Sequence, residues 1–160
     1  MTATNDMMLA ESALSIAARR SSGRQWRAFI DGLASVLPTT VGDETARTIL
    51  ARTGAQIAEG SPLAPAATVQ GLALSINDAL ERLDWGQIEL RETERSLDLV
   101  LVGYPLFESA DGRALFAATV ESVLDTWLQL QSDRDDLSVR LVKSGGGAYP
   151  ALIFRYEKNA

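Results

Sequence analysis

The most restrictive feature of this sequence is a change in the spacing of its apolar residues at Trp85-Gly86. Before this pair, apolar residues recur every three or four positions, as on a helix with one buried stripe; they are Val69, Leu72, Ala73, Ile76, Leu80 and Leu83. After it, Ile88 and Leu90 alternate with polar residues, which indicates a strand with one buried face. A helix over about 67–84 therefore runs directly into a strand. We expect Gly86 to be the hinge, and Trp85 to cover the sheet edge or a seam between subunits.

Two further helices precede this one. Apolar residues at helical spacing predict a helix over 24–37 that Pro38 brings to an end. Its single buried stripe is expected to contain Trp26, Phe29, Ile30, Leu33 and Leu37. A second helix is expected to start with Asp43 as its N-cap and to end near Gly60. The link at 61–65, SPLAP, is stiff because each proline fixes one backbone angle.

The second half of the chain predicts two hairpins with a long helix between them. The strand after Gly86 returns through a nearly continuous apolar run at 97–104. A helix over 111–131 follows, and then two strands over 137–143 and 151–157. Helices and antiparallel pairs are thus segregated along the chain. This order predicts an α+β fold, with N-terminal helices packed with an antiparallel four-stranded sheet (two hairpins) and a long helix between the hairpins.

The chain is expected to divide into a flexible N-terminal arm over 1–23 and a single α+β domain over 24–160. Within the arm, one face of a short helix could be formed by Met8, Leu9, Ala13, Ile16 and Ala17. Such an arm either frays in solvent or docks on a neighbouring protomer. The arm lacks the basic start of a signal peptide, and Glu11 and Ser12 interrupt its apolar residues, so we expect a cytoplasmic protein.

The composition excludes several kinds of chemistry. The 160 residues include no Cys and no His. The chain therefore lacks thiolate nucleophiles, the commonest general base near neutral pH and the usual ligands of zinc. The formal net charge of −6 disfavours nucleic-acid binding, which needs clustered Lys and Arg. We expect no enzyme activity, no catalytic residue, no metal site and no cofactor.

Two motifs that can carry chemistry elsewhere favour a loop and a solvated surface here. The glycines at 145–147 precede a strand, whereas a phosphate-binding loop needs a helix after its glycines. A carboxylate-based glycosidase needs two carboxylates at a fixed separation in a cleft. The candidate carboxylates lie on turns or on the polar face of a strand, which makes this the weakest alternative; they are Glu89, Glu92, Glu94, Asp133, Asp135 and Asp136.

Two groups of residues are candidates for contacts outside the protomer. Arg20, Arg24 and Arg27 cluster where the arm meets the first helix. They either balance an acidic chain or donate hydrogen bonds to a carbohydrate or an acidic partner. The helix at 111–131 carries an apolar arc too wide for one partner, so we expect it to pack on the sheet and on something else. From this arc we predict an oligomer interface that contains Phe116, Val120 and Trp127.

From about residue 24 onward, the sequence resembles the D subunit encoded in bacterial cellulose synthase operons. The resemblance rests on the helix ETARTILARTGAQIAEG, the link SPLAP, and the helix TVQGLALSINDALERLDWG. It continues through the hairpin GQIELRETERSLDLVLVGYP and the later stretches DTWLQLQ and ALIFRYE. The Leu-x-Trp-Gly junction is the most distinctive of these features. No single motif is a strict fingerprint, and their order and lengths together carry the match.

The resemblance implies a non-enzymatic accessory subunit whose α+β protomers dimerise and build a cylindrical octamer. It implies a scaffold for the cellulose synthase complex beneath the inner membrane, with a proline-rich accessory protein as a partner. It also implies passages that carry or align β-1,4-glucan chains for export or crystallisation. The arm is longer than the family's usual start, so no glucan-contact residue is carried over from the family. The alternative is an acidic dimeric secretion chaperone, although such chains usually place one helix, and not three, before the sheet.

Overall fold

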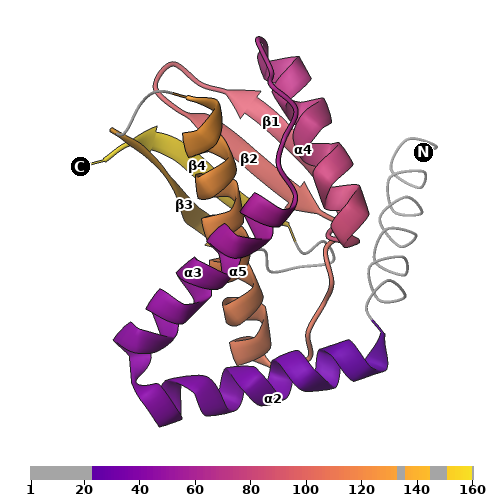
Figure 1. The fold of residues 1–160 in the computed structure, drawn as a ribbon, viewed down its shortest axis with the longest axis vertical. Helices are drawn as coiled ribbons and strands as arrows, with labels where there is room; N and C mark the ends of the chain where they lie inside the picture. Colours follow the sequence, from indigo (N-terminus) through magenta and orange to yellow (C-terminus); the bar gives the residue numbers. More distant parts are fainter. Residues whose placement is uncertain (1–22, 133–135, 145–150, 160) are drawn as a thin grey trace, which may run out of the picture.

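The computed structural model describes residues 23–132, 136–144 and 151–159, which form helices packed on one face of a sheet (Figure 1). In chain order the elements are α2 (Arg24–Val41), α3 (Asp43–Gly60), α4 (Val69–Leu83), β1 (Gln87–Glu92), β2 (Leu97–Val102), α5 (Ala110–Gln131), β3 (Leu137–Ser144) and β4 (Leu152–Lys158). This order confirms the predicted α+β class, with two hairpins and a long helix between them. The arm predicted over 1–23 lies, apart from Gly23, outside the described residues.

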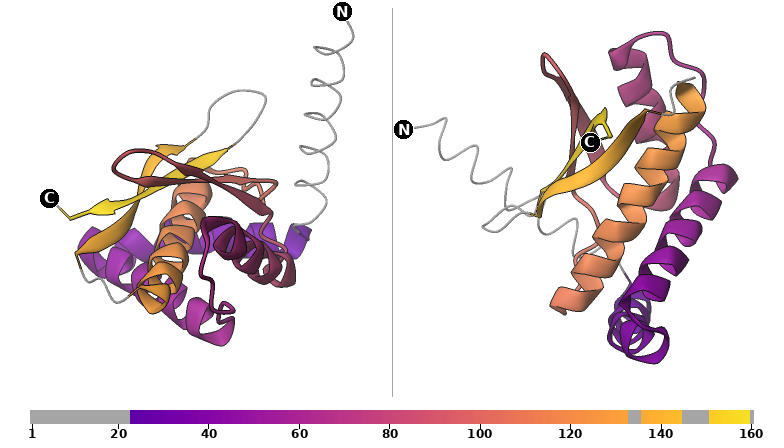
Figure 2. Two further views of the ribbon diagram at one scale, coloured as in Figure 1. Left: turned by 90° about the horizontal axis from the view of Figure 1, so that it is seen from above. Right: turned by 90° about the vertical axis from the view of Figure 1, so that its left-hand side faces the viewer.

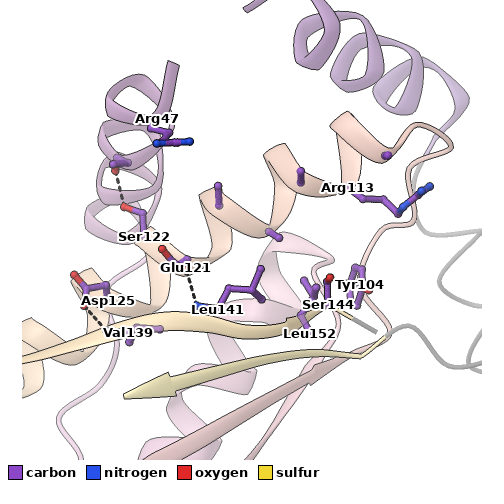
Figure 3. A pocket seen from close by; sticks show the side chains of 15 residues that line it. Arg47, Tyr104, Arg113, Glu121, Ser122, Asp125, Val139, Leu141, Ser144 and Leu152 are labelled. Carbon is purple, nitrogen blue, oxygen red and sulfur yellow. Dashed lines mark hydrogen bonds between the residues drawn. The ribbon is translucent and has the colours of Figure 1, made fainter. Parts of the chain in front are cut away.

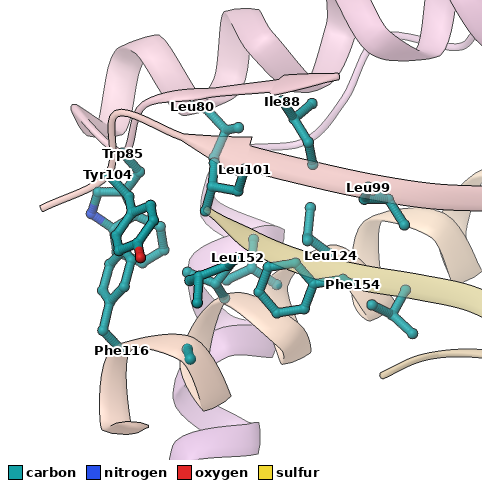
Figure 4. Packing of buried hydrophobic residues seen from close by; sticks show 14 of the residues in the cluster. Leu80, Trp85, Ile88, Leu99, Leu101, Tyr104, Phe116, Leu124, Leu152 and Phe154 are labelled. Atoms are coloured by element: carbon teal, nitrogen blue, oxygen red, sulfur yellow. The ribbon is translucent and has the colours of Figure 1, made fainter. Parts of the chain in front are cut away.

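The two hairpins join into one four-stranded antiparallel sheet. The strand order is β1-β2-β4-β3, so the second strand of each hairpin lies in the centre. Leu99 pairs with Phe154, and Leu101 pairs with Leu152. The helices cover one face of the sheet (Figure 2), and all four side chains are buried and point to that face (Figure 4). Successive side chains of a strand point to opposite faces, so these four residues mark the core face of the sheet.

Helix α5 lies at the centre of the molecule. It contacts β3 and β4 of the sheet on one side and α3 and α2 on the other. Trp127 is 1% exposed, and its Nε1–H donates hydrogen bonds to the carbonyl oxygens of Ala58 (3.2 Å) and Ser61 (2.9 Å). The wide apolar arc of this helix is therefore buried by two layers of the same protomer. The prediction that the helix packs on the sheet and on a second partner is confirmed, and the second partner is α3.

A glycine allows α3 and α5 to approach closely. A Cβ atom on Gly54 would lie 2.7 Å from the backbone oxygen of Thr119 and 2.6 Å from Cβ of Ser122. Ser122 uses this proximity to donate a hydrogen bond from its hydroxyl to the carbonyl oxygen of Ala51, at 2.6 Å. Backbone contact of this kind requires the smallest side chain at the crossing point.

The boundary between the first two helices differs from the sequence prediction. Pro38 does not end α2, which continues to Val41. A proline removes one helical hydrogen bond, and the hydroxyl groups of Thr39 and Thr40 donate to the carbonyl oxygen of Val36 in this last turn. The prediction of Asp43 as an N-cap is also wrong. Gly42 holds that position at a φ of +82°, and Asp43 is the first residue of α3, where its charge suits the positive end of the helix.

The Trp-Gly junction is a hinge, as predicted. Asp84 ends α4 in the left-handed region at a φ of +56°, and Gly86 follows at +89°. A Cβ atom on Gly86 would lie 2.2 Å from the backbone oxygen of Val102, so the position excludes a side chain. Trp85 packs edge-on against Phe116, with ring centroids 5.1 Å apart, and it is 9% exposed (Figure 4). It therefore belongs to the core of the protomer.

Candidate functional site

A groove runs along α5 between α3 and β3 (Figure 3). Its volume is about 770 Å³. Four alanines of α5 line it: Ala110, Ala114, Ala117 and Ala118. Polar side chains also border it, with Arg47 from α3, Arg113 and Glu121 from α5, and Ser144 from β3. A groove of this volume is in the size range of small-molecule binding sites.

The carboxylates in the groove are held by the backbone of the edge strand. Asp125 accepts a hydrogen bond from the backbone N–H of Val139 at 2.8 Å, and Glu121 accepts one from that of Leu141 at 2.5 Å (Figure 3). Both N–H groups face away from β4, on the open side of the sheet. Gln129 adds a third contact by donating to the carbonyl oxygen of Leu137 at 2.6 Å. These side chains close the edge of the sheet.

Tyr104 and Arg113 lie near one end of the groove. Arg113 donates hydrogen bonds to the carbonyl oxygens of Phe107 (3.0 Å) and Glu108 (2.7 Å), which fixes the start of α5 against the preceding loop. Burial raises the pKa of Tyr104 to about 12, and the nearby charge of Arg113 opposes this only in part. The phenol is therefore neutral at physiological pH.

A second feature is an apolar stripe on the outer face of α2. It consists of Trp26, Phe29, Leu33 and Val36, which are 44%, 61%, 37% and 57% exposed. The rings of Trp26 and Phe29 stack with their centroids 5.9 Å apart. On the adjacent face of the helix, Ile30 and Ala34 are buried in the core. A contiguous apolar surface of this kind usually marks a contact with another molecule.

The stripe corrects the sequence interpretation of this helix. The sequence predicts five apolar positions on one buried face, but only Ile30 of them is buried and Leu37 is half-buried. The exposed and the buried residues form two adjacent faces. The signal is present in the sequence, because Trp26, Phe29 and Val36 extend the apolar arc well beyond the width that one packed face needs.

The three arginines proposed for glucan or partner contact are only partly described. Arg20 lies outside the described residues, and Arg24 is the first residue of α2. Arg27 is half-buried and borders a hollow of about 380 Å³ together with Leu106, Phe107, Glu108 and Arg113. The structure thus places one of the three beside a concave surface.

The three residues predicted for an oligomer interface lie in the core of the protomer. Phe116, Val120 and Trp127 are 4%, 1% and 1% exposed. Their neighbours are the sheet, the Trp-Gly junction and α3, so these side chains are covered within the protomer. The exposed apolar stripe on α2 is the residue group that the sequence reasoning missed.

Features of other functional classes are not found in the described residues. None of their acidic side chains form a group that could hold a metal ion. Over the same part of the chain, every helix is either too short or too polar to cross a bilayer. The described residues that stand out on the surface are therefore the groove along α5 and the exposed apolar stripe on α2.

Comparison with known proteins gives one assignment. No curated protein matches the chain. A family model that describes the D subunit of cellulose synthase matches residues 12–155, which is nearly the whole sequence and includes all the described helices and the first three strands of the sheet. The resemblance noted from the Leu-x-Trp-Gly junction and the order of elements is thereby confirmed. This chain belongs to the cellulose synthase D-subunit family.

Proposed function

We propose that this protein is a non-enzymatic scaffold of bacterial cellulose synthesis that works by self-association. Membership of the D-subunit family supports a role in cellulose synthesis. The single observation that carries the scaffold proposal is the exposed stripe on α2, with Trp26, Phe29, Leu33 and Val36. An acidic protein that leaves two aromatic rings in solvent gains free energy by covering them with another protein surface.

The proposed mechanism is spatial. Protomers associate into dimers and these into an octamer, which holds the synthase complexes at fixed spacing on the cytoplasmic side of the inner membrane. Glucan chains that leave neighbouring synthases then emerge close enough to associate in order. A proline-rich accessory protein is the proposed second partner. Arg20, Arg24 and Arg27 remain the proposed contacts to glucan or to a partner.

The non-enzymatic part of the proposal has its own support. The chain has no Cys and no His. In the groove, Glu121 and Asp125 each accept a backbone hydrogen bond, which commits them to the structure of the sheet edge. The secretion chaperone considered above explains the acidic charge equally well. The family match and the three helices before the sheet favour the scaffold.

The proposal is tested in a cellulose-producing bacterium that lacks its own copy of this protein. The strain is complemented with the wild type or with the double variant Trp26→Asp and Phe29→Asp. Leu74→Asp is the control, because it places the same charge at an exposed apolar residue outside the stripe, on α4 (62% exposed). We expect the double variant to leave glucan polymerisation by isolated membranes unchanged and to lower the crystallinity of the product. Full restoration of crystallinity by the double variant would contradict the proposal.

A further inference from the structure

The stripe on α2 is too small to hold a dimer by pairing with itself. At their observed exposures, Trp26, Phe29, Leu33 and Val36 offer roughly 400 Å² of apolar surface. A stable interface buries about 800 Å² on each partner. A face-to-face pair of α2 helices would therefore bury about half of what is needed. If this stripe is an association surface, each copy has to contribute a second element.

The chain contains a segment suited to this role immediately before α2. Twenty-two residues precede Gly23, which caps α2 in an extended conformation with a ψ of 144°. Their apolar residues at helical spacing include Leu9, Ala13 and Ile16. As a helix, the stretch from residue 8 to 17 would be about 14 Å long, and the stripe from residue 26 to 36 is about 15 Å long. The two lengths match.

The edges of the sheet supply a second argument. Glu121, Asp125 and Gln129 occupy backbone groups on the open side of β3. At the other edge, Asn77 of α4 donates to the carbonyl oxygen of Ile88 at 3.0 Å and accepts from its N–H at 2.7 Å. Strand pairing between copies is therefore blocked along β3 and at the start of β1. Association through a helix face is left as the favoured route.

We propose that two copies exchange their N-terminal arms, so that the apolar residues of 8–17 from one copy cover the α2 stripe of the other. This inference rests on the proposed function, because it names the partner of the same stripe. Reciprocal exchange makes two contacts per dimer. Each copy buries both its stripe and its arm, roughly 800 Å² in all, which reaches the size of a stable interface. The break at Gly23 lets the arm leave the axis of α2.

The absence of native cysteine allows a direct test with the full chain. Two variants, Ala13→Cys and Leu33→Cys, are co-expressed with a tag on one of them, purified through the tag and oxidised. Each chain then carries a single thiol. We expect a disulfide-linked heterodimer between Cys at 13 and Cys at 33 as the main product. The control pair, Ala13→Cys with Leu74→Cys on α4, is expected to give little cross-link.

Four results would overturn the exchange. A chain that carries both thiols and links them within one monomer would show that the arm covers its own α2. A dominant link between two thiols at position 33 would show that two stripes face each other. An oligomer with no link between positions 13 and 33 would place the interface elsewhere and leave the proposed function standing. A protein that is monomeric at every concentration would overturn both proposals.

A second variant does not depend on cross-linking. Leu9→Asp puts a charge into the apolar residues of the arm, which precedes the described helices in the sequence. We expect Leu9→Asp to be monomeric at a concentration where the wild type is fully associated. Its thermal midpoint should equal that of Phe29→Asp at the same concentration, which would show that the protomer is still folded. An unchanged dimer in Leu9→Asp would contradict a role for the arm.

Discussion

At the scale of single residues, the Trp-Gly junction decides how the chain enters its sheet. Asp84 and Gly86 both have positive φ angles, and they turn the chain from α4 into β1 within three residues. Asn77 then ties α4 to β1 by two hydrogen bonds to the backbone of Ile88. The change of apolar period was enough to predict the hinge. The clamp by Asn77 was not predicted, because a polar residue off the buried stripe shows no partner in sequence.

Gly86→Ala is expected to destabilise the fold by about 2 to 4 kcal/mol. The φ of +89° disfavours any side chain, and the added Cβ would meet the backbone oxygen of Val102, which cannot move without breaking the hairpin. Urea denaturation measures the effect. Gly60→Ala is the matched control, because nothing lies within 4 Å of its Cβ position at the end of α3. Equal midpoints for the two variants would contradict the hinge.

The ion pair on the outer face of the sheet predicts a dependence on pH. Arg155 donates two hydrogen bonds to Asp98, at 2.7 and 3.1 Å, and these lower the pKa of Asp98 against the opposing effect of burial. A carboxylate with a lowered pKa stabilises the fold above its unfolded pKa of about 3.9, and this contribution is lost as pH falls through the folded pKa.

Asp98→Asn should therefore be less stable than the wild type at pH 7, and the difference should shrink as the pH falls below about 4. Thermal midpoints measured over the acidic range, from about pH 7 down to about pH 2.5, test this. Glu89→Gln is the control, because its pair with Arg91 has the same chemistry while Glu89 is 65% exposed, where solvent screens the interaction. A constant difference between wild type and Asp98→Asn across this range would contradict the assignment.

At the scale of elements, α5 has two roles along its length. Its apolar arc fills the core, and a polar ridge at every fourth residue, Glu121, Asp125 and Gln129, closes the edge of β3. Four helical residues advance about 6 Å, and two strand residues advance about 6.6 Å, so the ridge stays in register with alternate residues of the antiparallel strand.

The double variant Glu121→Ala and Asp125→Ala should free the N–H groups of Val139 and Leu141. Each lost bond is expected to cost about 1 to 2 kcal/mol, because the groups are partly buried. Hydrogen exchange at these two amides should become fast, and the exposed edge should promote aggregation. The double variant Glu121→Gln and Asp125→Asn retains an acceptor oxygen at each position and should keep exchange slow. Fast exchange in both double variants would indicate that carboxylate charge, and not an acceptor alone, is required.

The elements also show where sequence reasoning stops. The arc of α5 predicted two-sided packing correctly, yet it also assigned Phe116, Val120 and Trp127 to an interface between protomers. Periodicity reports that a helix face is apolar, but it does not report whether the covering layer comes from the same chain. The reverse holds at α2, where an apolar position such as Phe29 is expected to be buried and is 61% exposed.

At the scale of the whole molecule, the family and the surface lead to the same kind of function. The sheet is closed along β3, the carboxylates of the groove are engaged, and the stripe on α2 is exposed. The order of the elements and the fold class followed from the spacing of apolar residues. The exposed stripe on α2, which we propose as the association surface, did not, because it depends on how α2 is rotated against α5, and only the packed structure fixes that rotation.

The most direct test of this account is the molar mass of the purified full-length protein over a range of micromolar concentrations, measured by light scattering. The account predicts a defined oligomer of the 17.2 kDa chain, which Phe29→Asp shifts toward the monomer. The control Leu130→Asp, at a 68% exposed position near the end of α5, should leave the oligomer intact. A wild-type protein that stays monomeric throughout the range would contradict the central claim that it acts by self-association.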